Sequence, residues 1–446
     1  MRLVVPPGAA QTEALQKAID DCYLSGGGEV CLAAGEHHTG GLRLRSRVTL
    51  HLLSGAKLIG SRDPEDYFAY RRDAIEPLEK EEISDIPWSR QSADQDPSCS
   101  ILRIPGSRWN NALIRLLHAR DAAIVGDEGS VIDGMDPYDE AGEENYRGPH
   151  GIDAHDCENI RFSGYTIQNT GNWAHAVFHS RNLVFENITV LAGHDGIHVT
   201  SCANIQIDRC NFYTGDDCIA GFANQNVTVQ GCEINTACSA FRFGGTNVFV
   251  EDCHIFGPAR HVFRGSLTKE EKIAGAHPAK DGKHRFNMLS VFTYYADFSF
   301  PIPLEPRNIV FSRCRVENAD RFLHFNYSGN ELWQKNRPLS EICFQKIDAQ
   351  GITMPLTAYG DEQNPVRIAI RDSRIAFAPE ADVPLMHLAN CERVELVNLT
   401  ILRNGASPWI LAWGDAVTLE TKNIHGPGVE RLCITKAQEP FSCRAI

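Results

Sequence analysis

Three aspartates occupy two short stretches that also contain glycine. Asp195 stands in Gly-His-Asp-Gly-Ile (193–197), and Asp216 and Asp217 are adjacent in Thr-Gly-Asp-Asp-Cys (214–218). Asp and Gly are common turn formers, so a single Gly-Asp-Asp is typical of an ordinary turn. Crowded carboxylates repel one another, however, and a fold retains them where water, a partner or a function compensates. Paired carboxylates suit glycoside hydrolysis, in which one protonates the leaving oxygen and another activates water or attacks the sugar.

A repeat of about 22 residues sets the register of these carboxylates. Six similar segments align at asparagines separated by 23, 22, 22, 21 and 61 residues, namely Asn159, Asn182, Asn204, Asn226, Asn247 and Asn308. Asp195 follows Asn182 by 13 residues, and Asp217 follows Asn204 by 13. The two therefore occupy equivalent positions on neighbouring coils, about 4.8 Å apart along the axis, with Asp216 beside them. This registration favours a site over a simple turn.

The fold follows from the same repeat. Positions +1, +3, +6 and +8 from each asparagine are apolar or Cys in almost every copy, which indicates two short strands separated by a bend. Such a unit cannot bury its own apolar face, so successive units must stack. We expect an all-β, single-stranded right-handed parallel β-helix that forms one domain over residues 1–446. Residues 11–20 have helical spacing and are expected to cap the first coil.

Two stretches break the repeat, at about 62–109 and 266–307, and we expect them to form the walls of a groove. The +6 column predicts core packing, although it contains stacked cysteines: Tyr165, Ile188, Cys210, Cys232, Cys253 and Cys314. The asparagines predict a stacked amide ladder. The 15 cysteines fit reduced buried thiols, and because neither a CxxC pair nor an HExxH motif occurs, no metal and no cofactor is expected.

The motifs resemble those of a known family. GHDGI (193–197) and TGDDCIAG (214–221) are similar to the NTD and GDD motifs of polygalacturonases, glycoside hydrolase family 28. TEALQKAIDDC, GGGEVCLAAGEH, VTLHLLSGAKLIGSRDPEDY and Asn172-Trp173 resemble the same family. The resemblance implies a pectin-lyase-like solenoid in which Asp216 is the general acid. It also implies that Asp195 and Asp217 hold and deprotonate the water, with inversion at the anomeric carbon. The shared column of Asp195 and Asp217 agrees with this assignment.

The sequence departs from the family in its substrate-binding motifs. Ser239 stands where the GHG histidine is expected, and GPARHVFRGSL (257–267) replaces the RIK motif. Arg260 holds the matching column position, and Arg264 matches the family arginine after a shift of one residue. Tyr294 and Tyr295 are candidates to stack on a sugar ring, or else core aromatics, and Tyr294 is taken as the binding candidate.

A neighbouring column at +16 is expected to face outward: His175, His198, Ala220, Arg242 and Phe263. An arginine there suits a bidentate grip on a uronate carboxylate, although a solvated strand face or a bridge to a nearby acid is the alternative for Arg242. The candidate substrate-binding residues are thus His175, His198, Ser239, Arg242, Arg260, Arg264 and Tyr294.

We therefore expect an inverting, exo-acting glycoside hydrolase for pectic oligosaccharides derived from galacturonate or rhamnogalacturonan. Residues 259–286 contain seven Lys or Arg against three acids, which favours an anionic sugar or is simply a solvated charged loop. Two alternatives stay open. One is a pectate-lyase-like enzyme with calcium and a basic residue, and the other is a noncatalytic carbohydrate-binding β-helix.

Charge and composition bound the partners. A net charge of −14 argues against nucleic acid or an anionic membrane as partner. The N-terminus lacks the pattern of a signal peptide, so a cytoplasmic protein is expected, or a secreted or periplasmic one if the chain was trimmed. The oligomeric state is left open.

Overall fold

Strands are the predominant secondary structure of the computed structural model, which describes residues 1–67, 111–296, 306–327, 334, 336–414 and 418–438. Two compact units are present. The N-terminal unit comprises Met1–Asp216 and His261–Arg285, and the C-terminal unit comprises Asp217–Arg260 and Phe286–Ile446. Each unit consists of stacked coils whose strands pair in parallel with the strands of the neighbouring coils. The expected fold class, a right-handed parallel β-helix, is confirmed.

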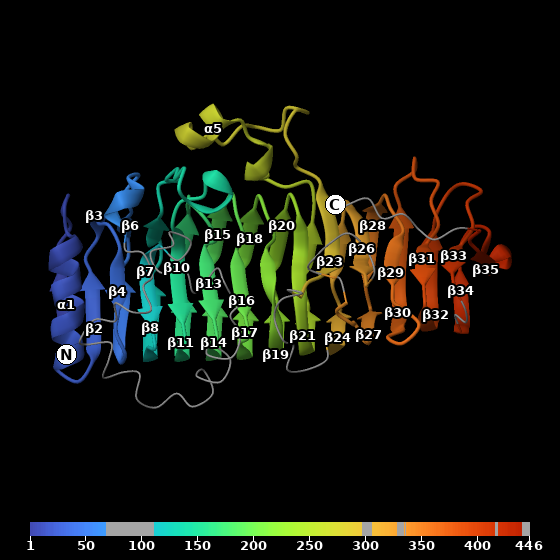
Figure 1. Ribbon diagram of the computed structural model, residues 1–446, viewed down its shortest axis with the longest axis horizontal. Coiled ribbons are helices and arrows are strands. Elements are labelled where there is room, and N and C mark those ends of the chain that lie inside the picture. The colour runs from blue at the N-terminus through green and yellow to red at the C-terminus, as the bar shows by residue number, and fades with distance from the viewer. Residues whose placement is uncertain (68–110, 297–305, 328–333, 335, 415–417, 439–446) are drawn as a thin grey trace. The chain divides into compact units, whose positions relative to one another are not determined.

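The N-terminal unit contains three stacks of strands. One stack runs through β2, β5, β8, β11, β14 and β17, a second through β3, β6, β9, β12, β15 and β18, and a third through β4, β7, β10, β13 and β16. Figure 1 shows β11, β14 and β17 side by side as parallel arrows. The strands are β1 (Arg2–Val5), β2 (Gly28–Leu32), β3 (Gly35–His38), β4 (Leu42–Leu44), β5 (Val48–Leu52), β6 (Ala56–Ile59), β7 (Ala112–Leu117), β8 (Arg120–Gly126), β9 (Val131–Asp133), β10 (His150–His155), β11 (Glu158–Ser163), β12 (Thr166–Gln168), β13 (His175–Phe178), β14 (Arg181–Glu186), β15 (Thr189–Ala192), β16 (Ile197–Thr200), β17 (Ala203–Asp208) and β18 (Asn211–Thr214). The helical segments are α1 (Thr12–Leu24), α5 (Lys269–Ala274) and the 3₁₀ turns η1 (Pro64–Asp66), η4 (Glu143–Asn145) and η5 (Arg264–Ser266).

The C-terminal unit repeats this plan, and some of its strands are longer, up to 13 residues. Among its described residues, the strands are β19 (Ile219–Gln230), β20 (Glu233–Thr236), β21 (Ser239–Glu251), β22 (His254–Phe256), β23 (Met288–Tyr294), β24 (Arg307–Ser312), β25 (Arg315–Glu317), β26 (Ala319–Asn326), β27 (Glu341–Gln345), β28 (Asp348–Ile352), β29 (Leu356–Tyr359), β30 (Val366–Phe377), β31 (Met386–Ala389), β32 (Cys391–Leu402), β33 (Ile410–Trp413), β34 (Thr418–His425) and β35 (Ile434–Lys436), and the described 3₁₀ turn is η6 (Val429–Arg431). A continuous run of pairing links β19, β21, β24, β27, β30, β32 and β34.

The asparagine column forms the expected amide ladder. All six asparagines have φ between 55° and 59°, a left-handed conformation that Asn tolerates better than most residues. Within the N-terminal unit the Asn182 side-chain amide donates to Asn159 at 2.8 Å, and Asn204 donates to Asn182 at 2.9 Å. Within the C-terminal unit Asn247 donates to Asn226 at 3.1 Å. Within each unit, these coils therefore turn at the same place and are joined there by the amide bonds.

The cysteine column lies in the core, as expected. Cys210, Cys232, Cys253 and Cys314 are at most 2% exposed, and each thiol donates to the carbonyl two residues earlier. They behave as small buried side chains.

The capping helix is confirmed and is longer than the sequence indicated. Helix α1 buries Leu15, Ile19, Cys22 and Tyr23 against the first coil. Among the described residues, no helix has the length and hydropathy needed to cross a membrane.

The second predicted insertion is only partly an excursion. Residues 261–285 leave the coils of the C-terminal unit and belong to the N-terminal unit. Residues 288–294, which the sequence assigned to the same insertion, instead form β23 and pair with β21 and β26. Most of the first predicted insertion, from residue 68 on, lies outside the described residues.

Candidate active site

Asp195 lies at the turn before β16 and is held by a histidine that rests on a tryptophan. The Asp195 side chain is about 5% exposed, and His198 Nδ1 lies 3.0 Å from its Oδ2. The His198 ring stacks on Trp173 with centroids 3.7 Å apart and planes 3° apart. Because the stack fixes the imidazole plane, the ring N–H points at the carboxylate and stabilises its ionised form.

Asp216 lies on the next turn of the same unit. The Gly215 N–H donates to Ala192 O at 2.9 Å, so this turn stacks directly on Gly193-His194-Asp195. A Cβ on Gly215 would come within 2.6 Å of Gly193 O and 2.0 Å of Val262 O, which explains the glycine. The Asp216 side chain is 13% exposed, and its Oδ2 lies 3.6 Å from Arg147 Nη2.

Arg147 connects Asp216 to a second acidic group that the sequence reading missed. Its Nε lies 3.7 Å from Glu143 Oε2 and 3.1 Å from Glu144 Oε2, and its Nη1 donates to Asn172 Oδ1 at 3.2 Å. One guanidinium is therefore shared among three carboxylates, and it does not neutralise Asp216 alone.

Glu143 has an unusual protonation equilibrium. Burial raises its pKa to about 7, the Arg147 charge and a hydrogen bond from Asn172 oppose this, and the charges of Glu144 and Asp195 add to the rise. Glu143 belongs to η4, in the long connection between β9 and β10. This connection lies outside the coil repeat. Its length was the only signal in the sequence that it could contribute residues to the site.

His194 is a second residue that was not predicted. It is 1% exposed, and among the described residues its ring nitrogens have no hydrogen-bond partner. Burial holds the pKa of His194 well below its ordinary value, and the charges of Arg147 and Arg264 lower it further. A neutral imidazole therefore precedes Asp195.

The excursion 261–285 covers these turns. Arg264 is 3% exposed and pairs with Asp136 at 2.5 Å, and His277 Nε2 lies 2.7 Å from the other Asp136 oxygen. A Cβ on Gly193 would lie 2.2 Å from Arg264 Cδ, so the arginine stem passes directly over this glycine. Figure 1 shows the segment with α5 above the coils that hold β15 and β18.

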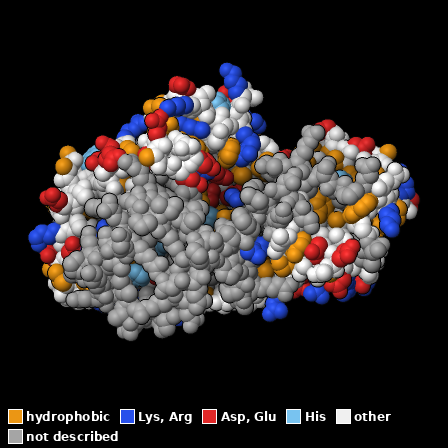
Figure 2. Space-filling view, in the orientation of Figure 1, with side chains coloured by type: hydrophobic (Ala, Val, Ile, Leu, Met, Phe, Trp, Pro, Cys, Tyr) orange, Lys and Arg blue, Asp and Glu red, His pale blue; other side chains and the backbone are white. Residues whose placement is uncertain are grey.

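Several basic residues of this excursion have partners within the protein. Lys269 pairs with Glu140, Lys272 lies 4.0 Å above the Tyr146 ring, and Arg285 lies 3.6 Å above the Phe263 ring. Figure 2 shows acidic and basic side chains mixed over the segment that carries α5. Much of the local positive charge therefore anchors the excursion, which weakens it as a signal for an anionic substrate.

In the C-terminal unit, Asp217 is fully buried and held from two sides. The Ser239 N–H donates to Asp217 Oδ1 at 2.9 Å, and Arg242 Nη1 lies 3.7 Å from Oδ2. Arg242 also lies 4.2 Å above the Tyr295 ring, and its side chain remains 31% exposed. The bridge to a nearby acid, left open for Arg242, therefore exists.

Two predicted binding residues lie in the core instead. His175 is fully buried, hydrogen-bonds the Tyr165 hydroxyl at 2.9 Å and packs edge-on against Phe185. The strand register pairs His175 with Ile197 and Ala176 with His198, so the predicted outward column is wrong by one residue here. A shift of one residue moves a strand side chain to the opposite face.

Tyr294 is also a core residue, packed edge-on against Phe325 at 5.2 Å. The adjacent Tyr295 is the aromatic residue beside Arg242. In the strand register Arg242 pairs with Thr293. Phe263, the residue predicted for this place in the column, belongs to the excursion 261–285 and not to a coil.

The remaining predicted substrate-binding residues are Ser239, Arg260, His198 and Arg264. Ser239 lies beside Asp217, and its hydroxyl donates to Thr293 at 3.2 Å. Arg260 is exposed, with its guanidinium 5.9 Å from the Phe256 ring centroid. His198 and Arg264 are buried against acids, which suits positioning better than direct contact with a sugar.

Comparison with known proteins agrees with the motifs. Residues 102–239 match the family model of glycosyl hydrolases family 28. A probable polygalacturonase of Vitis vinifera is 30% identical over 221 residues, which are 47% of this chain and 40% of that protein. The chain thus aligns with less than half of this relative.

Solved structures share the fold. An exopolygalacturonase of Thermotoga maritima matches with a TM-score of 0.60 at 17% identity, over 89% of this chain and 91% of that one. A surface protein and adhesin of Streptococcus pneumoniae matches with a TM-score of 0.53 at 12% identity, over 98% of this chain and all (100%) of that one. At these identities the likeness concerns the fold alone. The motifs around Asp195 and Asp216 lie inside the matched segment, so this part of the chain is similar to glycosyl hydrolases family 28 and to a probable polygalacturonase.

Proposed function

We propose that the protein is an inverting glycoside hydrolase that removes saturated units from the ends of galacturonate-containing pectic oligosaccharides. One observation carries the proposal. Two stacked turns present Asp195 and Asp216, and each carboxylate has a partner of a different kind. His198 donates to Asp195 and supports an ionised base, whereas Asp216 shares Arg147 with two other acids.

The division of roles follows from these partners. Asp216 donates a proton to the leaving oxygen, and Asp195 together with Asp217 deprotonates the attacking water. Asp217 is suited to an ionised role because the Ser239 N–H and the Arg242 charge both stabilise its carboxylate. Burial of the three carboxylates strengthens each of these interactions, since the surroundings screen charge less than water does.

Arg242 and Tyr295 support an acidic sugar as the substrate. Arg242 lies over the Tyr295 ring with 31% of its side chain exposed, and a guanidinium can donate two N–H groups to a planar carboxylate. Every residue of a galacturonate polymer carries such a carboxylate, whereas only alternate residues of rhamnogalacturonan carry one. We therefore expect galacturonate oligomers to be better substrates than rhamnogalacturonan fragments.

The test uses purified full-length protein and a panel of galacturonate and rhamnogalacturonan oligosaccharides without added metal. We expect a saturated mono- or disaccharide that the Asp216→Asn variant fails to release. Asp121→Asn is the matched control, because Asp121 begins the asparagine ladder by accepting from Asn159 at 2.8 Å and an asparagine suits that place. NMR of the first product anomer tests inversion.

Other outcomes decide between the rivals. Products that absorb in the ultraviolet and are lost with a chelator would indicate a lyase, and a rapid loss of polymer viscosity at low product yield would indicate endo attack. Glycan binding without turnover, unchanged in Asp216→Asn, would indicate a noncatalytic β-helix.

A further inference from the structure

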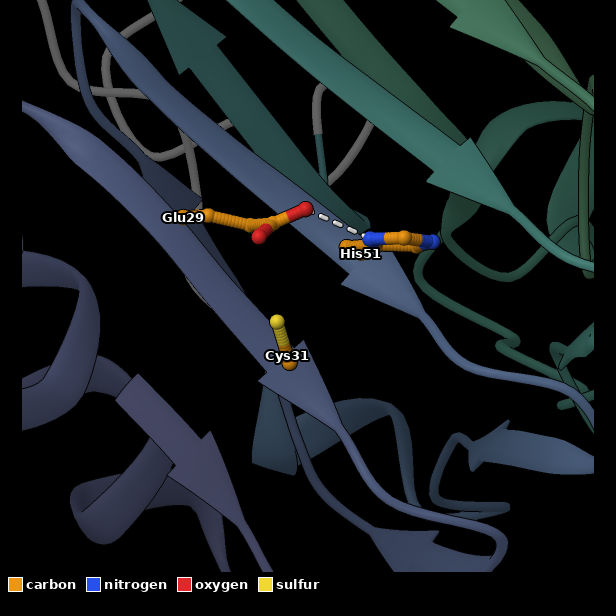
Figure 3. Close-up of side chains that lie close together, drawn as sticks. All are labelled: Glu29, Cys31 and His51. Carbon is orange, nitrogen blue, oxygen red and sulfur yellow. Dashed lines mark hydrogen bonds and ion pairs between the residues drawn. The ribbon is translucent and has the colours of Figure 1, made fainter. Parts of the chain in front are cut away.

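A second cluster of titratable side chains lies on the first coils of the N-terminal unit. Glu29 and Cys31 belong to β2, and His51 belongs to β5, directly opposite Cys31 in the strand register. One ligand atom from each of the three lies within 4.8 Å of the others. Figure 3 shows the three side chains directed toward one another from the two strands.

These donors match the preferences of one class of metal. Zinc binds thiolate sulfur, imidazole nitrogen and carboxylate oxygen, whereas calcium and magnesium take oxygen ligands. Tetrahedral zinc bonds of 2.0–2.3 Å place donor atoms about 3.4 Å apart. Glu29 Oε1 and His51 Nδ1 are 2.6 Å apart, so this pair would need to open by less than about 1 Å.

The second nitrogen of His51 provides an independent observation. Its Nε2 lies 2.9 Å from Asp127 Oδ1, just beyond the end of β8. A histidine that binds a metal through one nitrogen commonly donates its other N–H to a carboxylate, which fixes the tautomer and the ring orientation. With Nδ1 toward Glu29 and Cys31, and Nε2–H toward Asp127, His51 already has that arrangement.

A cation already lies beside these donors. Arg2 Nε lies 3.3 Å from Cys31 Sγ and 3.1 Å from Glu29 Oε2. The Arg2 side chain is 62% exposed, so it can leave toward solvent at small cost, whereas Cys31 is fully buried. The arginine therefore acts as a removable competitor for a metal ion.

We propose that Glu29, Cys31 and His51 form a zinc site, with Asp127 orienting His51 and Arg2 competing for the same donors. Zinc binding displaces the thiol proton of Cys31 and any proton on His51 Nδ1, and a water completes the coordination. The site joins β2, β5 and the turn after β8 in the first coils of the N-terminal unit, where β1 pairs with β2. It is independent of the proposed hydrolysis.

The test measures zinc bound by full-length protein after chelator treatment and dialysis against zinc chloride. We expect one zinc per chain in the wild type and a loss of at least tenfold in affinity for Cys31→Ser and His51→Ala. The control is Cys157→Ser, because Cys157 donates to His155 O and the equivalent Ser180 on the next coil donates to Phe178 O in the same way. This control should retain its zinc.

Arg2→Met is expected to bind zinc more tightly than the wild type. A variant that failed to fold could not show such a gain in zinc affinity. Removing the competing charge should raise zinc affinity about tenfold, and zinc should raise the unfolding temperature more than in the wild type. Cobalt in place of zinc should give a thiolate-to-cobalt charge-transfer band that Cys31→Ser lacks.

Three results would overturn the proposal. They are stoichiometric zinc in Cys31→Ser, a charge-transfer band that survives that substitution, and an unchanged affinity in Arg2→Met. The last result would show that the cluster is a set of ion pairs with Arg2 as its permanent partner.

Discussion

The imidazole of His198 lies parallel to the indole of Trp173, 3.7 Å away, with its Nδ1 3.0 Å from Asp195 Oδ2. Trp173 is 9% exposed and His198 is 3% exposed, so the pair forms a rigid support below the carboxylate. His198 thus acts through Asp195 and is a positioning residue.

Substitutions at His198 distinguish the contribution of its stacked ring from that of its N–H donor. His198→Phe keeps the stack but removes the donor, and we expect kcat to fall about 100-fold with KM nearly unchanged. His198→Asn retains an amide donor and should lose less. Steady-state kinetics on a galacturonate oligomer would check this, and a Phe variant with wild-type kcat would exclude the positioning role.

Arg147→Lys tests the shared guanidinium. A lysine keeps the charge but cannot hold three carboxylates and Asn172 in one planar arrangement, so we expect kcat/KM to fall about 10- to 100-fold. The control is Arg181→Lys, whose side chain is 39% exposed and pairs with Glu158. Equal activity of the two variants would show that Arg147 only supports the loop.

Gly193→Ala tests the passage of Arg264 over the turn. The new Cβ would meet Arg264 Cδ, and we expect unfolding free energy to fall by about 1–3 kcal/mol. Arg264→Ala removes that contact, so the double variant should lose less than the sum of the single losses. Urea unfolding measures all three, and additivity within about 0.5 kcal/mol would contradict the contact.

Glu143→Gln tests the raised pKa of Glu143. This carboxyl holds its proton more tightly in the folded protein, with a pKa of about 7 against 4.5, so stability declines as pH rises from 4.5 to 7. The decline amounts to about 2–3 kcal/mol for a side chain that is 23% exposed. We expect unfolding curves of the Gln variant to lack this decline, and those of Glu144→Gln, a change at a 51% exposed side chain, to keep it.

His175→Phe tests the opposite dependence on pH. Burial lowers the pKa of His175 to about 4, so the unfolded chain binds its proton more readily, and stability is lost as pH falls from 6.5 to 4. The loss amounts to about 3 kcal/mol. Phe lacks the bond to Tyr165 and should lower stability at pH 7, yet its unfolding free energy should change less between pH 7 and pH 4. The control is His38→Gln, at a half-buried position outside this cluster, and it should keep the dependence on pH of the wild type.

The sequence by itself determined the coils, because their signals are local and periodic. An asparagine at each bend suits a positive φ and hydrogen-bonds the asparagine one repeat away, so the positions of Asn159, Asn182 and Asn204 follow from the period of the sequence. Glycines 193 and 215 likewise marked the turns that carry Asp195 and Asp216, because close stacking leaves no room for a side chain there.

Tertiary structure decided which side chains surround those carboxylates. His175 lies inward because the 23-residue step between Asn159 and Asn182 contains one extra residue, and strand alternation turns a shift of one into a change of face. Arg147 and Glu143 come from a connection outside the repeat. Arg264 comes from the excursion 261–285, which belongs to the N-terminal unit although the residues before and after it belong to the C-terminal unit. Contacts of this kind depend on the path of the chain in space, and no period in the sequence encodes that path.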